Sequence, residues 1–375
     1  MVNDGPKINI DIPEEDARLL FDCALKQNPT VKSIHVSQLG RVGYSGANLF
    51  RAYFDEKKRG YPFVVKIDSR KNITKEVSAI NKVKIYFPDA LSGFERCYYK
   101  GKGAIVYLLF ASIEGDGEAE VVELKDVVYD LSKDNAEILE SFDSLYKTSC
   151  VVAHTSGQSK GVNIKHQYKR YLRDRKADDL ITAVLKNKNG TTPFKFLGAD
   201  VIDPRSFLDS GFRAPLRCIL SAVHGDLHPN NVVFGHDGKL KLIDFAWGHQ
   251  SAHVLKDFVL MENSLRFLLF PPYVNLELQQ KVDEALLNED GYDRISEMVG
   301  DSNLVQHYVR LAGIIEIIRS YARIVGGSEY DFDEYLAAQF LMLYGLLKYP
   351  GYHFHVGLRA LGMIANRLAC SRFGF

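Results

Sequence analysis

The segment from residue 221 to 248, SAVHGDLHPNNVVFGHDGKLKLIDFAWG, constrains this chain most, because it places two aspartates and an asparagine around one predicted hairpin. Its two short β-like runs are joined by Gly-His-Asp-Gly, a sequence typical of a hairpin turn. Asp226 and Asn231 lie before or at the start of this hairpin, and Asp244 follows it. Since a hairpin brings its two ends back together, we expect these three side chains to meet in one site.

This set of side chains suits phosphoryl transfer. One carboxylate, here Asp226, would orient the attacking hydroxyl and take its proton, while Asn231 and Asp244 would hold Mg²⁺ against the nucleotide phosphates. The sequence HGDLHPNN resembles the catalytic-loop motif of the aminoglycoside phosphotransferase and choline kinase branch of the protein-kinase-like superfamily. The resemblance implies a bilobal α+β fold, with a small N-terminal β-sheet lobe and a larger, mainly helical C-terminal lobe.

Gly225, the residue before the first aspartate, indicates which kind of acceptor the protein uses. Gly225 stands where regulated protein kinases carry an arginine that pairs with a phosphorylated activation loop. The glycine cannot make that contact, and no Ala-Pro-Glu sequence follows Asp244. We therefore expect Mg²⁺ with ATP, or GTP, as the donor and a small-molecule hydroxyl as the acceptor, of aminoglycoside, choline, sugar or amino-alcohol type. A kinase acting on a protein partner and a nucleotide-binding regulatory protein without turnover stay open.

Upstream, the sequence predicts a phosphate-binding turn in the small lobe. After a helix near residues 14–27, strands are expected near 34–36 and over 48–54, with several glycines between them. Glycine lets the backbone approach phosphate oxygens closely and turn its N–H groups toward them. Glycines between two strands also mark ordinary hairpins. The turn residues assigned to the nucleotide are Gly40, Gly43, Ser45 and Gly46.

A lysine and a glutamate are expected to form an ion pair beside these phosphates. The strand expected over residues 61–67 presents Lys66 from mostly apolar surroundings, where an ammonium group needs a partner. Apolar residues at helical spacing predict a helix over 73–83, and Glu76 lies on its inward face. The resemblance assigns Lys66 to the α and β phosphates, with Glu76 as its partner. A solvent-facing lysine and a first-turn glutamate that favours the helix dipole are the alternatives.

Residues 103–110 read as a further buried strand that leads into a polar, glycine-containing segment. In kinase-like folds the chain crosses between the lobes at this point, and the backbone of the crossing segment binds the adenine edge. The resemblance therefore places the hinge at residues 110–113 and assigns Phe110, Ser112 and Ile113 to the nucleotide.

Length and composition fit two lobes. A chain of 375 residues exceeds one ordinary domain, and we expect a nucleotide-binding lobe over residues 1–112, with a short N-terminal extension, and a C-terminal lobe over 113–375. The 47 basic and 47 acidic residues balance, so no overall field favours nucleic acid or an anionic membrane. The five scattered cysteines contain no Cys-x-x-Cys pair, and no apolar leader or long apolar run occurs. These features predict a cytoplasmic protein with reduced thiols.

Several segments of the large lobe allow two interpretations. The acidic run over 114–123 and the basic stretch over 165–176 could bind charged ligands or could be solvated surface. The stretch from Lys186 to Asp203 is expected to be irregular and could cover the cleft. The aromatic residues and histidines over 349–355 could line an acceptor pocket or belong to the core.

Three further residues receive supporting roles. The resemblance makes Asp257 a structural aspartate that begins a helix behind the catalytic loop and accepts the loop's backbone N–H groups. We expect His224 to be a buried scaffold histidine. His228 occupies the position where protein kinases carry a lysine near the transferred phosphate, so it could stabilise that charge or cap the loop.

Overall fold

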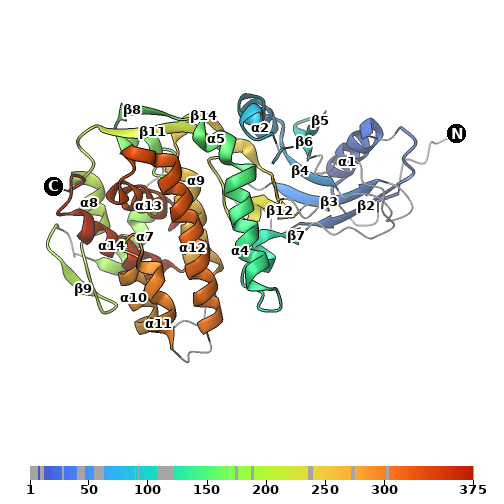
Figure 1. Ribbon diagram of the computed structural model, residues 1–375. Coiled ribbons are helices and arrows are strands. Elements are labelled where there is room, and N and C mark those ends of the chain that lie inside the picture. Colours follow the sequence, from blue (N-terminus) through green and yellow to red (C-terminus); the bar gives the residue numbers. More distant parts are fainter. Residues whose placement is uncertain are drawn as a thin grey trace.

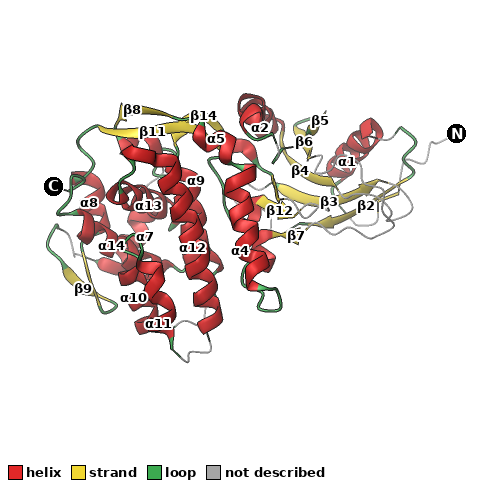
Figure 2. Ribbon diagram, in the orientation of Figure 1, coloured by secondary structure: helices red, strands yellow, loops and turns green. Residues whose placement is uncertain are grey.

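The computed structural model describes residues 7–8, 12–27, 29–39, 47–54, 63–88, 90–91, 93–107, 122–173, 176–186, 190–234, 240–271, 275–300 and 304–374. These residues form two lobes that lie side by side, with the two chain ends at opposite sides of the molecule (Figure 1). The smaller N-terminal lobe is built on a β-sheet and the larger C-terminal lobe is mainly helical (Figure 2). The bilobal α+β architecture expected from the sequence is therefore confirmed.

The small lobe is built on a six-stranded sheet with the strand order β1-β2-β3-β4-β6-β5. Neighbouring strands are antiparallel except for the parallel pair β1 and β2. The elements of this lobe are β1 (Lys7–Ile8), α1 (Glu14–Gln27), β2 (Ser33–Gln38), β3 (Asn48–Phe54), β4 (Phe63–Ser69), α2 (Arg70–Val83), a 3-10 turn (Lys84–Tyr86), β5 (Phe94–Tyr99) and β6 (Lys102–Tyr107).

Alternation along β4 places its residues in two different cores. Val65 and Ile67 pack in the core that contains Leu19 and Leu20 of α1, whereas Val64 packs in the core that contains the apolar face of α2. Successive side chains of a strand point to opposite faces of its sheet, so Lys66 shares the face of Val64 and points toward α2. This is the face that meets the large lobe, because the core containing α2 continues into the C-terminal helices.

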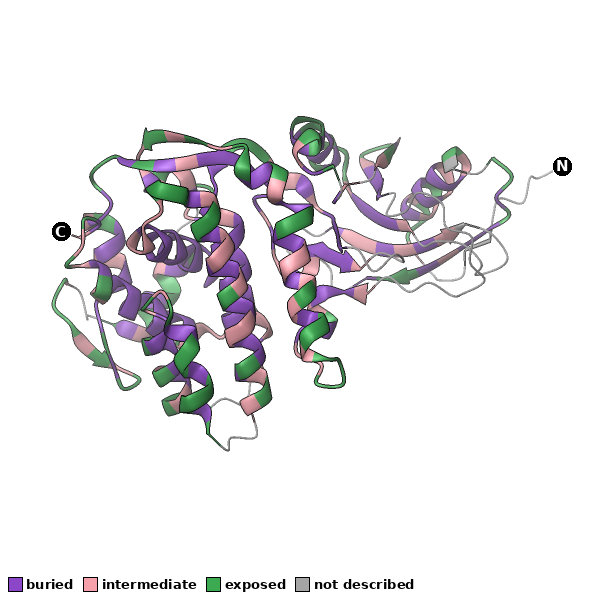
Figure 3. Ribbon diagram, in the orientation of Figure 1, coloured by how far each residue is buried: buried purple, intermediate pink, exposed green. Residues whose placement is uncertain are grey.

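Helices make up most of the large lobe, and nearly every residue of its α9 and α13 is buried (Figure 3). Helices α4 and α9 each continue into a π-helical turn, at Leu145–Ser149 and Leu265–Leu269. The helices are α3 (Leu124–Val127), α4 (Asn135–Ser144), α5 (Val151–Thr155), α6 (Ile164–Tyr168), α7 (Lys176–Leu185), α8 (Pro204–Ser210), α9 (Leu255–Ser264), α10 (Leu276–Ala285), α11 (Ile295–Val299), α12 (Val305–Gly326), α13 (Phe332–Leu346) and α14 (Phe354–Leu368).

Short sheets in the large lobe carry the loops of the candidate site. Two three-stranded sheets have the orders β14-β11-β8 and β13-β12-β7, and β9 pairs with β10. The chain enters the HGDLHPNN loop from β11 and leaves it into the hairpin formed by β12 and β13. The strands are β7 (Val122–Glu123), β8 (Gln158–Val162), β9 (Phe194–Phe196), β10 (Ala199–Val201), β11 (Leu216–Val223), β12 (Val232–Phe234), β13 (Leu240–Leu242) and β14 (His249–His253).

The stretch from Lys186 to Asp203 differs from the expectation that it is irregular and covers the cleft. It contains the hairpin of β9 and β10, in which Phe196 pairs with Ala199. Apolar residues on alternate positions of this hairpin pack against Met363 of α14, which explains why the segment is ordered on the large lobe. Figure 1 places β9 at the end of the large lobe that lies away from the small lobe.

A buried ionic network connects the central helices. Glu262 of α9 accepts hydrogen bonds from Arg319 of α12 at 3.1 and 3.0 Å and from Arg266 at 2.9 Å. Tyr335 and Gln339 of α13 donate to the same carboxylate, each at 2.7 Å. Burial opposes ionisation, but the two guanidinium groups outweigh it and lower the pKa of Glu262 to about 2. The network therefore fixes three helices around one charged group.

Replacing Arg319 should destabilise the protein strongly. In Arg319→Met, Glu262 keeps its buried charge but loses one guanidinium partner, and breaking a buried pair costs about 3–5 kcal/mol. Arg323 lies one turn further along α12 and forms half-exposed ion pairs with Glu289 and Asp290, so Arg323→Met should cost less than about 1 kcal/mol. Urea unfolding of the two variants measures the difference, and equal losses would contradict this account of the network.

Candidate active site

Lys66 lies where the two lobes meet. Its Nζ is 2.8 Å from Oε2 of Glu76 on α2 and 2.6 Å from Oδ2 of Asp244, which follows β13. The side chains of Lys66 and Glu76 are almost completely buried. The structure thus brings together the lysine and the glutamate that the sequence pairs, and it adds Asp244 as a second partner.

Two carboxylates compete for this one ammonium group. Burial and the charge of Asp244 raise the pKa of Glu76 to about 7, although Lys66 acts in the opposite direction. Burial also opposes ionisation of Asp244, but the charge of Lys66 outweighs it and the pKa of Asp244 is lowered. Asp244 therefore holds its negative charge more readily than Glu76, and a cation bound at Asp244 would relieve the repulsion between them.

Tyr107, the last residue of β6, connects the same groups. Its buried hydroxyl donates a hydrogen bond to Oε1 of Glu76 and accepts one from the backbone N–H of Asp244 at 2.9 Å. Asp244 itself has left-handed backbone angles, φ 62° and ψ 63°, which are unfavourable for a residue other than glycine. The Tyr107 hydroxyl helps to hold this conformation. Sequence reasoning missed Tyr107, although a tyrosine in a buried strand generally signals a hydroxyl with a partner.

Asp257, in the first turn of α9, fixes the loop that carries Asp226. Its Oδ2 accepts the backbone N–H of His224 and its Oδ1 accepts that of Gly225, both at 2.8 Å. The Nε2 of His154 lies 3.0 Å from Oδ2 on the other side. The fully buried Asp257 thus has the structural position that the sequence predicts for it.

Gly225 is required by the backbone of this loop. Its φ is +75°, and a Cβ atom there would lie 2.4 Å from the carbonyl oxygen of Trp247. Tyr171 donates a hydrogen bond to the Gly225 carbonyl, and its ring stacks on that of Trp247. The loop and the segment after Asp244 are therefore packed together through a position that only glycine fits.

The loop also orients Asn231. Its Nδ2 donates to the backbone carbonyl of Asp226 at 2.8 Å and lies 3.1 Å from Nε2 of His228, so its Oδ1 can act as a ligand. His228 is 3.9 Å from the Asp226 carboxylate. His224 is fully buried, with Nε2 2.9 Å from the Ile243 carbonyl, and this agrees with the scaffold role expected for it.

The donor atoms suit Mg²⁺. Asp244 offers a carboxylate and Asn231 a side-chain carbonyl, and hard divalent cations prefer such oxygen ligands. Burial raises the pKa of Asp226, and the charge of Asp244 acts in the same direction while His228 opposes both. The site thus combines a carboxyl group of raised pKa with two oxygen donors and a buried lysine, which is the chemistry of phosphoryl transfer.

Arg170 is a second residue that sequence reasoning did not single out, because it lies within a basic stretch. Its guanidinium carbon lies 3.3 Å from the centre of the Trp247 ring. Burial lowers the pKa of Arg170, and the negative charge of Asp226 partly offsets that effect. Arg170 therefore adds a positive charge over the ring of Trp247, whose backbone packs against Gly225.

Other predicted contacts lie outside the described residues, so they stay predictions. They comprise the turn residues Gly40, Gly43, Ser45 and Gly46, the hinge residues Phe110, Ser112 and Ile113, the acidic residues up to 120 and the lobe boundary at 112. The C-terminal aromatic residues are described. Tyr349, Tyr352 and Phe354 pack against the main core, which favours the core interpretation over an acceptor pocket.

The Tyr107 hydroxyl gives a test of this geometry. Tyr107→Phe leaves Glu76 without one donor and the Asp244 N–H without its acceptor, so unfolding should become easier by about 1–3 kcal/mol. Tyr98→Phe on the neighbouring strand β5 is the control, because its half-buried ring packs against the core and no hydrogen bond of its hydroxyl to a described residue is found. Denaturant unfolding compares them, and a loss as small as that of Tyr98→Phe would contradict the bridging role of Tyr107.

A family model described as Ternary complex associated domain 9 matches residues 165–341. No curated protein matches the chain. None of the helices in the described part of the chain has both the length and the apolar character needed to cross a membrane.

Similar solved structures extend over most of the chain. Choline kinase LicA from Streptococcus pneumoniae is 12% identical over 89% of this chain and 99% of that one, with a TM-score of 0.37. An ethanolamine kinase of Plasmodium vivax is 11% identical over 90% and 89%, with a TM-score of 0.37. A thermostable aminoglycoside phosphotransferase APH(4)-Ia, in a ternary complex with ADP and hygromycin B, is 14% identical over 87% and 97%, with a TM-score of 0.40.

Proposed function

We propose that this protein is a Mg²⁺-dependent phosphotransferase that moves the γ-phosphate of ATP or GTP to a hydroxyl group. The observation that carries the proposal is the position of Lys66, which contacts both Glu76 and Asp244 where the lobes meet. A buried ammonium held between a helix glutamate and a metal-binding aspartate is the arrangement that positions nucleotide phosphates in kinases.

Each residue has a defined task in this proposal. Asp244 and Asn231 would hold Mg²⁺, which supplies charge neutralisation for the phosphates. Lys66 would turn from Asp244 toward the phosphate oxygens, while Glu76 keeps the ammonium in place. The turn over residues 40–46 would add backbone N–H groups.

Asp226 would orient the acceptor. The hydroxyl oxygen forms a bond to the γ-phosphorus, its proton passes to Asp226, and the bond to the β-phosphate oxygen breaks to release the nucleoside diphosphate. The raised pKa of Asp226 makes it a better proton acceptor than an ordinary carboxylate. The charge of Arg170 would stabilise the phosphoryl group during transfer.

A small-molecule acceptor, of aminoglycoside, choline, sugar or amino-alcohol type, is supported by Gly225. The position lacks the arginine through which a phosphorylated segment controls a protein kinase. We extend the proposal to the division of labour between the lobes, in which residues 1–112 bind the nucleotide and 113–375 provide the metal ligands, the base and the acceptor site.

Asp226→Asn should remove turnover without removing nucleotide binding. General-base catalysis contributes at least about 100-fold to such rates, so acceptor-stimulated ADP or GDP release should fall by that factor or more. The measurement uses MgATP and MgGTP with a panel of aminoglycosides, choline, ethanolamine, sugars and amino-alcohols. Asp179→Asn, at an exposed position of α7, is the matched control.

Each outcome of that assay decides between classes. Retained turnover in Asp226→Asn would exclude this aspartate as the base. If the wild type binds nucleotide but no acceptor stimulates the release of ADP or GDP, the protein would be either a kinase with a protein acceptor or a regulatory protein without turnover.

The pH dependence of kcat/KM gives an independent test. Asp226 must be ionised to act, and its pKa is raised, so activity should fall on the acid side at a pH above the ordinary carboxyl value of 3.8. The charge of His228 favours the ionised form, so His228→Gln should move this acid limb to still higher pH. If the activity of His228→Gln falls at the same acidic pH as that of the wild type, His228 does not influence the pKa of Asp226.

A further inference from the structure

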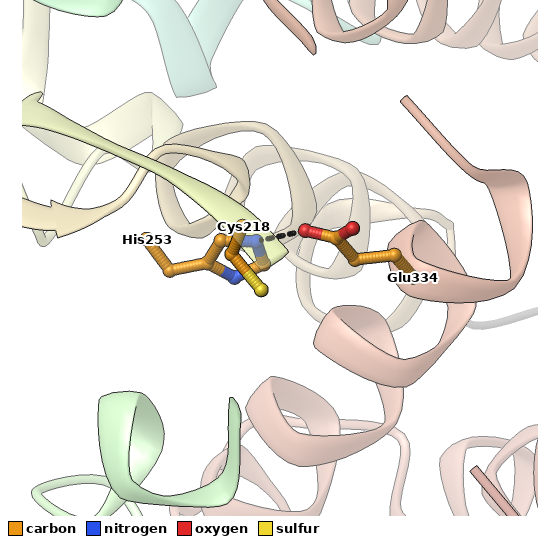
Figure 4. A group of neighbouring side chains, drawn as sticks. All are labelled: Cys218, His253 and Glu334. Atoms are coloured by element: carbon orange, nitrogen blue, oxygen red, sulfur yellow. Dashed lines mark hydrogen bonds and ion pairs between the residues drawn. The ribbon is translucent and has the colours of Figure 1, made fainter. Parts of the chain in front are cut away.

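A second group of chemically reactive side chains lies apart from the Asp226 and Asp244 site, where β11, β14 and α13 meet. Figure 4 shows Cys218, His253 and Glu334 directed toward one another. One ligand atom from each residue lies within 4.8 Å of the other two. All three side chains are buried, and three separate elements of the fold supply them.

We propose that Cys218, His253 and Glu334 form a binding site for one Zn²⁺ ion. Thiolate, imidazole and carboxylate are the donors that zinc takes in proteins, at about 2.0–2.3 Å. Ligand atoms of a tetrahedral site with such bonds lie roughly 3.3–3.8 Å apart, so the most distant pair has to approach by about 1 Å. The Nε2 of His253 and Oε1 of Glu334 are 2.8 Å apart as a hydrogen-bonded pair, so these two atoms would separate by roughly 0.5–1 Å to bind the ion.

Charge and orientation both suit the ion. A thiolate and a carboxylate together offset the two charges of zinc, which matters in a buried site because an uncompensated charge is costly there. The Tyr168 hydroxyl lies 3.0 Å from Nδ1 of His253, on the far side of the ring. A partner on one ring nitrogen fixes the histidine and leaves the other nitrogen for the metal, a common arrangement around bound zinc.

A cavity of about 10 Å³ adjoins the cluster at Glu334 and has room for a fourth ligand. It is lined by Glu334 and by the acidic residues Glu329 and Asp331, and also by Tyr330, whose buried hydroxyl has no hydrogen-bond partner among the described residues. A space of this size holds one water molecule, which could bind the ion as a fourth ligand. Arg372 contacts Asp331 at 2.7 Å and lies 3.8 Å from the second oxygen of Glu334.

Binding requires no redox partner. The Cys218 thiol releases its proton to solvent as the sulfur–zinc bond forms. The imidazole proton that faces Glu334 moves from Nε2 to Nδ1, where the Tyr168 hydroxyl can accept its hydrogen bond, and Nε2 and the Glu334 carboxylate then bind the ion. The competing interpretation is a purely hydrogen-bonded cluster, in which Glu334 accepts from His253 and Cys218 and no metal binds. The two interpretations differ in what they require of the sulfur atom.

The variant Cys218→Ser distinguishes the zinc site from the purely hydrogen-bonded cluster, because serine keeps a hydrogen-bonding group of similar size but is a poor zinc ligand. The chelator-treated full-length protein is titrated with Zn²⁺ against a competing chromophoric chelator. We expect one equivalent to bind to the wild type and to Cys370→Ser, the control at an exposed cysteine. Binding to Cys218→Ser should be weaker by at least about 100-fold. Equal zinc binding by the wild type and Cys218→Ser would overturn the proposal.

Cobalt gives a readout that does not depend on affinity. Co²⁺ bound by Cys218 should produce a thiolate-to-cobalt charge-transfer absorption in the wild type and in Cys370→Ser, and Cys218→Ser should lack it. Glu334→Gln serves as a second variant if Cys218→Ser does not fold, and it should bind zinc more weakly while keeping the absorption at saturating cobalt. A wild type without this absorption contradicts the site. Neither measurement depends on phosphotransferase activity.

Discussion

The buried ammonium group of Lys66 is the charge around which the two lobes are arranged. A lysine so far from water needs anionic partners, and it finds them on α2 and directly after β13, so the helix of one lobe and the segment of the other that carries Asp244 have to meet at the same point. Tyr107 adds a neutral connection between the same two groups. Because one cation faces two carboxylates, the site holds an excess of negative charge, which a divalent ion bound at Asp244 would offset.

The large lobe holds the reactive loop by its backbone. Asp257 accepts two consecutive N–H groups of the loop, so a residue outside the loop holds its backbone in place. Behind Asp257, the same helix α9 carries Glu262, whose charge is shared with guanidinium groups from the π-helical turn after α9 and from α12. Support for the loop thus extends through one helix from the candidate site to the centre of the lobe, and the proposed zinc site would fasten α13 to the strands on either side of that loop.

Features encoded by local patterns could be predicted from the sequence. The amphipathic helix over residues 14–27 and the strand over 48–54 have the predicted bounds, and the Lys66 pair with Glu76 follows from alternation on a strand and spacing on a helix. Contacts between distant segments could not be predicted in this way. Tyr107 accepts a hydrogen bond from a backbone group 137 residues away. Arg170 lies in a stretch with several other basic residues, and only the structure shows its contact with the Trp247 ring. The hairpin of β9 and β10 was missed because it depends on packing against a helix near the C-terminus.

The close packing at Gly225 limits how this chain could change. The backbone of Trp247 occupies the space that any side chain at position 225 would need, and the positive φ adds strain for every residue other than glycine. An arginine there, the residue through which regulated protein kinases respond to phosphorylation, would therefore require the segment after Asp244 to move as well. Control by phosphorylation cannot be acquired here through one substitution, so any regulation of this loop has to act from elsewhere in the molecule.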